Sequence, residues 1–178
     1  MIIATAQGMI ARFNETEVRP MGRDAGGVIG IRLLKREGDN VVAMTVVEPD
    51  ADLLVLTETG YGKRVPLAEF RRKHRGGQGV RLIALEGRKT GNVAAVQQVT
   101  EEDEELLLIS AGGQVIRTET NSVNRYSPGA RGVTVMRLAE GDRVVGIAAF
   151  RPGLAEQGTI GDNGDPGTGP DEGPNRGA

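Results

Sequence analysis

The chain has 178 residues, 38% of them hydrophobic, which is enough for a core without covalent cross-links. It has no cysteine and one histidine, which excludes a disulfide scaffold, a thiolate metal site and a zinc centre. No run of 18 apolar residues and no signal-peptide pattern occurs, which predicts a cytoplasmic protein without a membrane anchor. The formal net charge is slightly negative, at −2.

The sequence contains three copies of one unit. A marker of Thr or Ser, then Gly, then Arg begins at Thr5, with the Gly three and the Arg seven residues later. It begins again at Thr57 and at Ser110, after periods of 52 and 53 residues. The full marker comprises Thr5, Gly8 and Arg12, then Thr57, Gly60 and Arg64, then Ser110, Gly113 and Arg117. We therefore divide the body into repeats 1–48, 52–99 and 105–150.

The apolar segments within each unit are short and end at Gly, Asn or Asp, as strands do. Residues two apart share a face in Ile29-Ile31-Leu33, which is typical of a strand. The only helical candidate is 66–74, where we expect at most one turn. The expected strands include 53–56, 93–96 and 106–109, and Val133-Val135 alternates in the same way as 29–33. The pattern predicts an all-β, propeller-like fold of three blades, each with about four antiparallel strands.

Residues 151–178 differ in composition from the body. They hold eight Gly, four Pro, five acidic residues and two Arg, a net charge of 2 − 5 = −3. Such a segment buries too little apolar surface to offset its ordering entropy. We expect a disordered acidic tail.

Positive charge concentrates in residues 60–89, where nine Lys or Arg accompany two Glu. Its centre, KHRGGQG at 73–79, combines basic side chains with a glycine turn that suits a phosphate contact. The alternative is that the glycines serve only the turn and that the basic residues form a solvated face, although the charge of +7 across residues 60–89 exceeds what solubility needs. The sequence offers no helix for reading bases in the major groove, and aromatic residues, at 3%, are too few for single-strand stacking. Backbone contact with a bent duplex is therefore the favoured interpretation.

The units resemble the blades of the DNA gyrase A C-terminal domain. Each reads as a strand, a T-x-x-G-x-x-x-R turn, a loop, a glycine turn and a closing G-D/N-x-V-V strand. The stretch 73–79 falls where that family carries a sequence box. The pattern of the box is Q, then R or K, then R-G-G, then R or K, then G. Arg75, Gly76, Gly77 and Gly79 match the box, whereas Lys73, His74 and Gln78 depart from it.

The resemblance implies a β-pinwheel with strands exchanged between neighbouring blades and a basic rim around which double-stranded DNA wraps. It implies partners in the rest of gyrase A and in the gyrase B protein, and a role in ATP-dependent negative supercoiling near the nucleoid. No cofactor is expected in this chain, since ATP and Mg²⁺ would act elsewhere in the complex. The expected DNA-binding residues are Arg12, Lys63, Arg64, Arg71, Arg72, Lys73, His74, Arg75, Gly76, Gly77, Gly79, Arg117, Arg125 and Arg131.

The family domain usually has six blades, so the three blades of this chain are interpreted as its C-terminal half.

Three alternatives to this interpretation remain open. The related protein of topoisomerase IV carries similar blades, and a protein-binding propeller is the broader rival. Catalysis by the chain itself is the weakest option, because no acid/base or nucleophile group recurs near one turn, and neither Tyr61 nor Tyr126 matches the family's active-site tyrosine.

Overall fold

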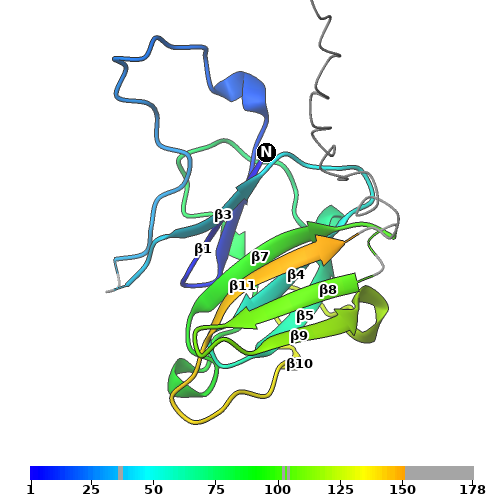
Figure 1. Ribbon diagram of the computed structural model, residues 1–178. Coiled ribbons are helices and arrows are strands. Elements are labelled where there is room, and N and C mark those ends of the chain that lie inside the picture. Colours follow the sequence, from blue (N-terminus) through cyan, green and yellow to red (C-terminus); the bar gives the residue numbers. More distant parts are fainter. Residues whose placement is uncertain (36–37, 102, 104, 151–178) are drawn as a thin grey trace, which may run out of the picture.

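The computed structural model describes residues 1–35, 38–101, 103 and 105–150. Within these ranges the chain forms eleven strands and four 3-10 helices of three residues each. The strands make three antiparallel sheets (Figure 1). No helix of the described part is long and apolar enough to cross a membrane.

The first sheet has the strand order β3-β1-β2-β6. Three of its strands come from the first unit: β1 (Ile2–Thr5), β2 (Met9–Arg12) and β3 (Val41–Thr45). The fourth, β6 (Val80–Arg81), belongs to the second unit and pairs with β2. The second unit therefore lends a strand to the first sheet.

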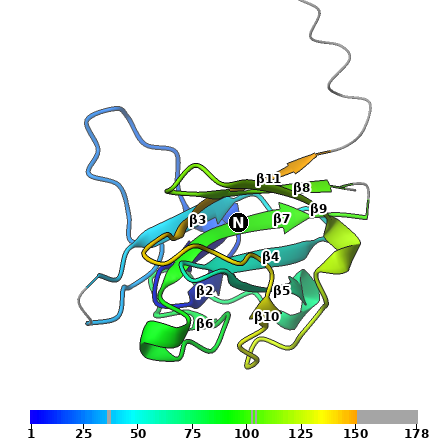
Figure 2. The ribbon, with the colours of Figure 1, turned by 60° about the horizontal axis from the view of Figure 1, so that its bottom comes forward.

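The second sheet repeats this arrangement with the order β10-β5-β4-β7. The second unit contributes β4 (Asp52–Thr57), β5 (Tyr61–Pro66) and β7 (Val93–Val99). The outer strand β10 (Val133–Thr134) comes from the third unit and pairs with β5 (Figure 2). The exchange of strands between neighbours is thus repeated at the second junction.

The third sheet has three strands among the described residues, in the order β11-β8-β9. They are β8 (Glu105–Ser110), β9 (Val115–Glu119) and β11 (Val144–Phe150). In the described ranges β9 pairs with β8 alone, so the sheet ends at β9.

Single 3-10 turns follow the marker arginine in every unit. These turns are η1 (Glu15–Glu17), η2 (Leu67–Glu69) and η4 (Thr120–Ser122), and a further turn, η3 (Gly87–Lys89), precedes β7. The single turn expected within 66–74 is confirmed by η2.

The core lies between the stacked sheets. Ile2 and Ile10 of the first sheet pack with Leu53 of the second in one buried cluster. Leu54, the next residue of β4, packs with Leu106 of the third sheet in another. Successive side chains of a strand point to opposite faces, so β4 is buried on both of its faces.

The all-β pinwheel predicted from the repeats is confirmed, with sheets of four, four and three strands among the described residues. The repeat boundaries stay a prediction. The predicted acidic tail, 151–178, lies outside the described residues.

Candidate nucleic-acid interface

The basic box lies on the loop between η2 and β6, where the second unit reaches the first sheet. Gly76 donates its backbone N–H to the Gly30 carbonyl across 2.7 Å. The Gly77 carbonyl accepts the N–H of Arg32 across 2.8 Å. Both bonds tie the box to the first unit, so the protein itself fixes the path of this loop.

Two of the box glycines have structural reasons to be glycine. Gly79 has a φ of +75°, and a Cβ there would lie 2.3 Å from the Ile10 carbonyl oxygen. Gly132, its counterpart before β10, has a φ of +84° and would meet the Gly62 carbonyl oxygen at 2.3 Å. Gly76 has a φ of +77°. The close approach of the exchanged strand requires glycine at position 79, and the left-handed backbone favours glycine at position 76. Neither glycine therefore needs a phosphate contact to explain it.

Arg75 is held by the first unit rather than directed to solvent. Its Nε donates to the Glu17 carbonyl and its Nη1 to the Ile29 carbonyl, each across 3.0 Å. Its backbone N–H donates to the Glu17 carboxylate at 3.1 Å, and His74 Nδ1 lies 3.3 Å from the same oxygen. The backbone N–H of Arg75 and, to a smaller extent, the His74 ring lower the pKa of the Glu17 carboxyl. Arg75 therefore orders the box loop.

The residues beside Arg75 are exposed, and of these His74 contacts Glu17. Arg71, Arg72, Lys73 and His74 are all exposed. A surface hollow of about 270 Å³ brings Arg71 and Lys73 together with Arg81, and Glu69 also lines it. Across the described part of the chain, Arg71, Arg72, Lys73 and Arg81 form no ion pair. We call these four residues the cationic surface.

Arg81 is absent from the contacts predicted from the sequence, although it lies within the basic stretch. Strand alternation was the signal that could have found it. Val80 is partly buried against the core, so the next residue of β6 points outward. Arg81 is accordingly exposed on the exchanged strand, opposite Met9.

The marker arginine of the first unit joins two units. Arg12 Nη1 donates to the carbonyls of Leu67 (3.0 Å) and Phe70 (2.9 Å), which lie at the two ends of the first turn of the second unit. The Arg12 carbonyl in turn accepts the N–H of Lys73 at 2.8 Å. Arg12 is partly buried in this junction.

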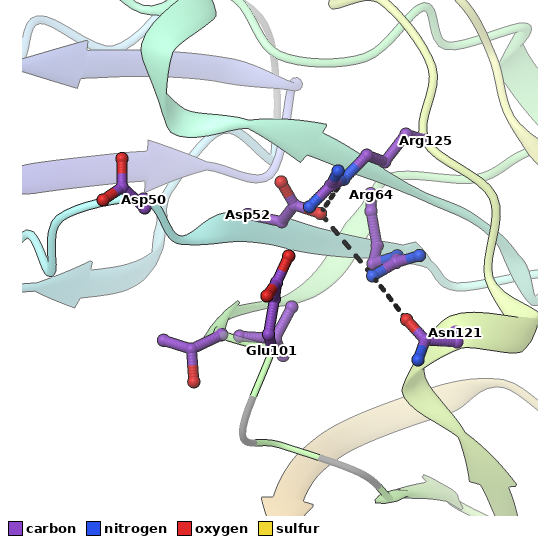
Figure 3. Close-up of a pocket in the computed structure, with 8 residues that line it drawn as sticks. Asp50, Asp52, Arg64, Glu101, Asn121 and Arg125 are labelled. Carbon is purple, nitrogen blue, oxygen red and sulfur yellow. Dashed lines mark hydrogen bonds and ion pairs between the residues drawn. The ribbon is translucent and has the colours of Figure 1, made fainter.

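Arg64 occupies the same place between the second and third units. Its Nε donates to the Val123 carbonyl across 2.6 Å, much as the Arg12 guanidinium donates to the Phe70 carbonyl. Its Nη1 lies 3.6 Å from the carboxylate of Asp52, which is buried (Figure 3). Burial lowers the pKa of the Arg64 guanidinium, and the charge of Asp52 opposes that effect.

Arg125 shares Asp52 with Arg64. Its Nε donates to Asp52 Oδ2 across 2.6 Å, and this hydrogen bond raises the pKa of Arg125. The surrounding surface pocket, about 340 Å³ in volume, is also lined by Asp50 and Glu101 (Figure 3). With three carboxylates around two guanidiniums, this pocket is a poor site for phosphate.

Lys63 and Arg131 also do not lie as free cations on the predicted DNA-binding rim. Lys63 is fully buried, and its Nζ donates to the carbonyls of Ser127 (2.6 Å) and Pro128 (3.0 Å). Arg131 donates to Glu86 across 2.7 Å, and its guanidinium carbon lies 5.0 Å from the centre of the Tyr61 ring. Lys63 cannot reach DNA from the interior, and we leave it out of the proposed contact surface.

Arg117, the third marker arginine, contacts no turn of a following unit among the described residues. It is exposed and forms an ion pair with Glu105 of the neighbouring strand β8. The three marker arginines therefore do not form a uniform row. Among the described residues, no group of three or more His, Asp or Glu side chains is placed to hold a metal ion.

Comparison with known proteins agrees with this geometry. The family model for the DNA gyrase C-terminal domain, a β-propeller, matches residues 1–48, 51–100 and 104–151. The chain belongs to the DNA gyrase C-terminal domain family. The DNA gyrase A protein of Staphylococcus epidermidis is 39% identical over 150 residues, covering 83% of this chain and 16% of that protein. The DNA gyrase A protein of Pseudomonas aeruginosa is 40% identical over 147 residues, with the same coverage.

Solved structures show the same fold. A structure of the DNA gyrase A C-terminal domain aligns with a TM-score of 0.76 and 32% identity, covering 84% of this chain and 50% of that one. The C-terminal domain of DNA topoisomerase IV also aligns with a TM-score of 0.76, at 22% identity, which shows the fold alone. The chain thus spans about half of a solved gyrase domain and about a sixth of the curated gyrase A proteins.

Proposed function

We propose that this chain binds the backbone of double-stranded DNA through the cationic surface of Arg71, Arg72, Lys73 and Arg81. The observation that carries the proposal is the grouping of exposed cations that form no ion pair among the described residues, on the box loop, whose path the protein already fixes, and on the adjoining strand β6. Cations of this kind neutralise phosphates and release counterions. Because the loop is fixed before binding, little ordering entropy is lost when DNA arrives.

The contacts suit a bent duplex rather than a particular base sequence. The described fold has no helix longer than a single 3-10 turn, so nothing enters the major groove as a recognition helix. A duplex following the outer strands would be held by its phosphates and selected by its ease of bending. Such bending would wrap DNA around the domain, as the resemblance to the gyrase A C-terminal domain implies.

The wider role belongs to the same proposal. As part of gyrase A, the chain would act with the rest of that protein and with gyrase B on bacterial DNA, in the cytoplasm near the nucleoid. The ATP and Mg²⁺ used for supercoiling would bind elsewhere in that complex, and this chain would supply no catalytic group.

Salt-dependent binding of a labelled duplex tests the proposal. Replacing Arg71 or Lys73 by Ala should weaken binding to all sequences alike and lower the slope of log K against log salt by about 0.9 for each lost phosphate contact. Arg137→Ala serves as the matched control, because Arg137 is exposed on the third unit outside the cationic surface. If neither cationic-surface variant changes the salt slope, DNA binds at another surface. If binding does not depend on salt concentration, a protein-binding propeller is favoured instead.

Topoisomerase IV is the second candidate, on the strength of the shared fold. DNA bending separates the two roles. Energy transfer between the ends of a labelled duplex should rise on binding if the chain wraps DNA, and should stay unchanged if it only contacts a preferred DNA geometry.

A further inference from the structure

The box loop is attached to β2 at two points. The Arg12 carbonyl accepts the N–H of Lys73 across 2.8 Å, and Ile10 pairs with Val80 of the exchanged strand β6. Ala11 lies between these two attachments on β2. Its side chain is a single methyl group, so the strand places almost no side-chain atoms at this position of the junction.

The junction between the second and third units has the same two attachments. The Arg64 carbonyl accepts the N–H of Tyr126 across 2.9 Å, and Gly62 pairs with Val133 of β10. The residue between the attachments is Lys63, on β5. A long cationic side chain therefore occupies the place that a methyl group occupies in the first junction.

Lys63 uses its ammonium to bind the loop of the third unit. It is fully buried, and its Nζ donates to the carbonyls of Ser127 across 2.6 Å and of Pro128 across 3.0 Å. One repeat earlier, the residues at these two places of the box loop are His74 and Arg75. The carbonyls of His74 and Arg75 are thus the counterparts of the two that bind an ammonium.

The first junction supplies no such donor to its two carbonyls from the described residues. Within these residues, neither the His74 nor the Arg75 carbonyl accepts a hydrogen bond from a backbone N–H or a side chain. The carboxylate of Glu17 lies beside them, with one oxygen 3.1 Å from the Arg75 backbone nitrogen and 3.3 Å from His74 Nδ1. The acceptors and the negative charge that a cation needs are therefore present at the box loop.

A surface hollow of about 220 Å³ adjoins this position. Ala11 and His74 line it, and so do the apolar side chains of Ile10, Phe70 and Val80. The hollow therefore lies where the first junction lacks the long side chain that the second junction has, and part of its wall is apolar.

We propose that this hollow binds a primary alkylammonium ion, with its nitrogen at the place that Lys63 Nζ occupies in the other junction. The ammonium donates to the carbonyls of His74 and Arg75, and the alkyl chain packs against the apolar wall. Carbonyl acceptors are needed because a charge that leaves water without partners is strongly destabilised. Glu17 favours the positive charge, and salt screens the repulsion from the exposed cations of the cationic surface.

The chemistry of the position selects this class of ligand. A primary ammonium carries hydrogen-bond donors and no acceptor, which matches two carbonyls that lack a donor. A phosphate or carboxylate would meet these acceptors with acceptors of its own. A multivalent metal ion is not favoured, because the described part of the chain has no group of three or more His, Asp or Glu side chains placed to hold one. The inference does not depend on DNA binding.

Titration of the full chain with n-butylammonium chloride tests the proposal, because this ion has the chain length and head group of a lysine side chain. The backbone NMR signals of His74 and Arg75 and the methyl signal of Ala11 should shift with n-butylammonium and reach saturation. Tetramethylammonium chloride is the matched control, since it carries the same charge but no N–H donor. It should leave these signals unchanged at the same ionic strength.

Two variants exchange the surroundings of the two loops. Ala11→Lys supplies an ammonium from the chain itself, so its box loop should no longer respond to n-butylammonium. Lys63→Ala removes the ammonium from the second junction, so the signals of Ser127 should shift with n-butylammonium as those of His74 do in the wild type. In the wild type, the Ser127 signals should not respond.

Equal responses to the two salts overturn the proposal, because the loop would then sense ionic charge alone. It is also overturned if n-butylammonium produces no saturable shift in the wild type, or if a folded Ala11→Lys chain still responds. Should Ala11→Lys not fold, Lys63→Ala gives the deciding comparison. Ser127 signals that stay unchanged in the folded Lys63→Ala chain would mean that these loop carbonyls do not bind a separate ammonium, which overturns the proposal as well.

Discussion

At the scale of single residues, the repeated arginine has similar surroundings in the first two units and different surroundings in the third. Arg12 and Arg64 donate to carbonyls of the turn that follows in the next unit, whereas Arg117 is exposed beside Glu105. Hydrogen bonds from a charged donor to a buried acceptor stabilise more than exposed ion pairs do. The structure therefore supports the interpretation that Arg12 and Arg64 hold the units together.

We predict that Arg12→Ala and Arg64→Ala each lower the free energy of unfolding by about 1–3 kcal/mol, because their carbonyl partners lose a charged donor. Arg117→Ala should change it by less than about 0.5 kcal/mol, as for an exposed ion pair. Urea denaturation of the three variants measures this difference. The salt slope of DNA binding should stay unchanged for Arg12→Ala and Arg64→Ala when the folded proteins are compared. A reduced slope with full stability would make these arginines phosphate contacts instead.

Lys63 is a second residue whose environment differs from that of an ordinary basic rim. Burial lowers the pKa of its ammonium from 10.5 to about 8. Below pH 8 both folded and unfolded states carry the proton, and above 10.5 neither does. Between these values the unfolded state binds more protons than the folded state, so the contribution of Lys63 to stability rises with pH.

Chemical denaturation across this pH window tests the effect. The free energy of unfolding of the wild type, minus that of Lys63→Met, should increase between pH 8 and 10.5 and be flat on either side. Other titrating groups cancel in the difference because both proteins share them. A difference that is constant through the window would mean that Lys63 keeps an ordinary pKa in the folded state.

At the scale of elements, β6 and β10 were predictable but their partners were not. The strand expected around Ile29-Ile31-Leu33 was wrong, because the structure has no strand between β2 and β3 among the described residues. The repeating glycine turns located β6 and β10, since each follows a Gly of positive φ in the same repeat position. No residue within a two-residue strand specifies which sheet it joins. That choice depends on Gly79 and Gly132, where only a glycine allows the neighbouring unit's backbone to approach so closely. The exchange could be expected from the family resemblance, but not from periodicity.

The candidate site was predictable where side chains are long and lie on loops. Arg71, Arg72 and Lys73 are exposed as expected, because the box loop has no core face. Along β5, strand alternation places Lys63 on the same face as the buried Val65, but its charge suggested a surface residue. The sequence alone did not show that two carbonyls of the next unit would accept its ammonium.

At the scale of the whole molecule, charge is divided between the body and the C-terminal segment. Residues 1–150 carry 20 basic and 19 acidic side chains, a net charge of +1, and residues 151–178 carry two and five, a net charge of −3. The segment thus attaches net negative charge to a body that bears the cationic surface. A tethered acidic chain competes with phosphate at high effective concentration.

We predict that removing residues 151–178 strengthens DNA binding at low salt, because the shortened chain no longer carries acidic charges that compete with phosphate. The gain should shrink as ionic strength rises, since screening weakens attraction between exposed charges beyond about 10 Å at 0.1 M salt. A full-length variant with its five tail acids changed to Asn or Gln separates charge from length, and it should bind as tightly as the shortened chain. Duplex titrations of the three proteins across a salt series give the comparison. If all three proteins bind DNA equally at the lowest salt, the segment does not compete with DNA. If only the shortened chain binds more tightly, the size of the segment, and not its charge, weakens binding.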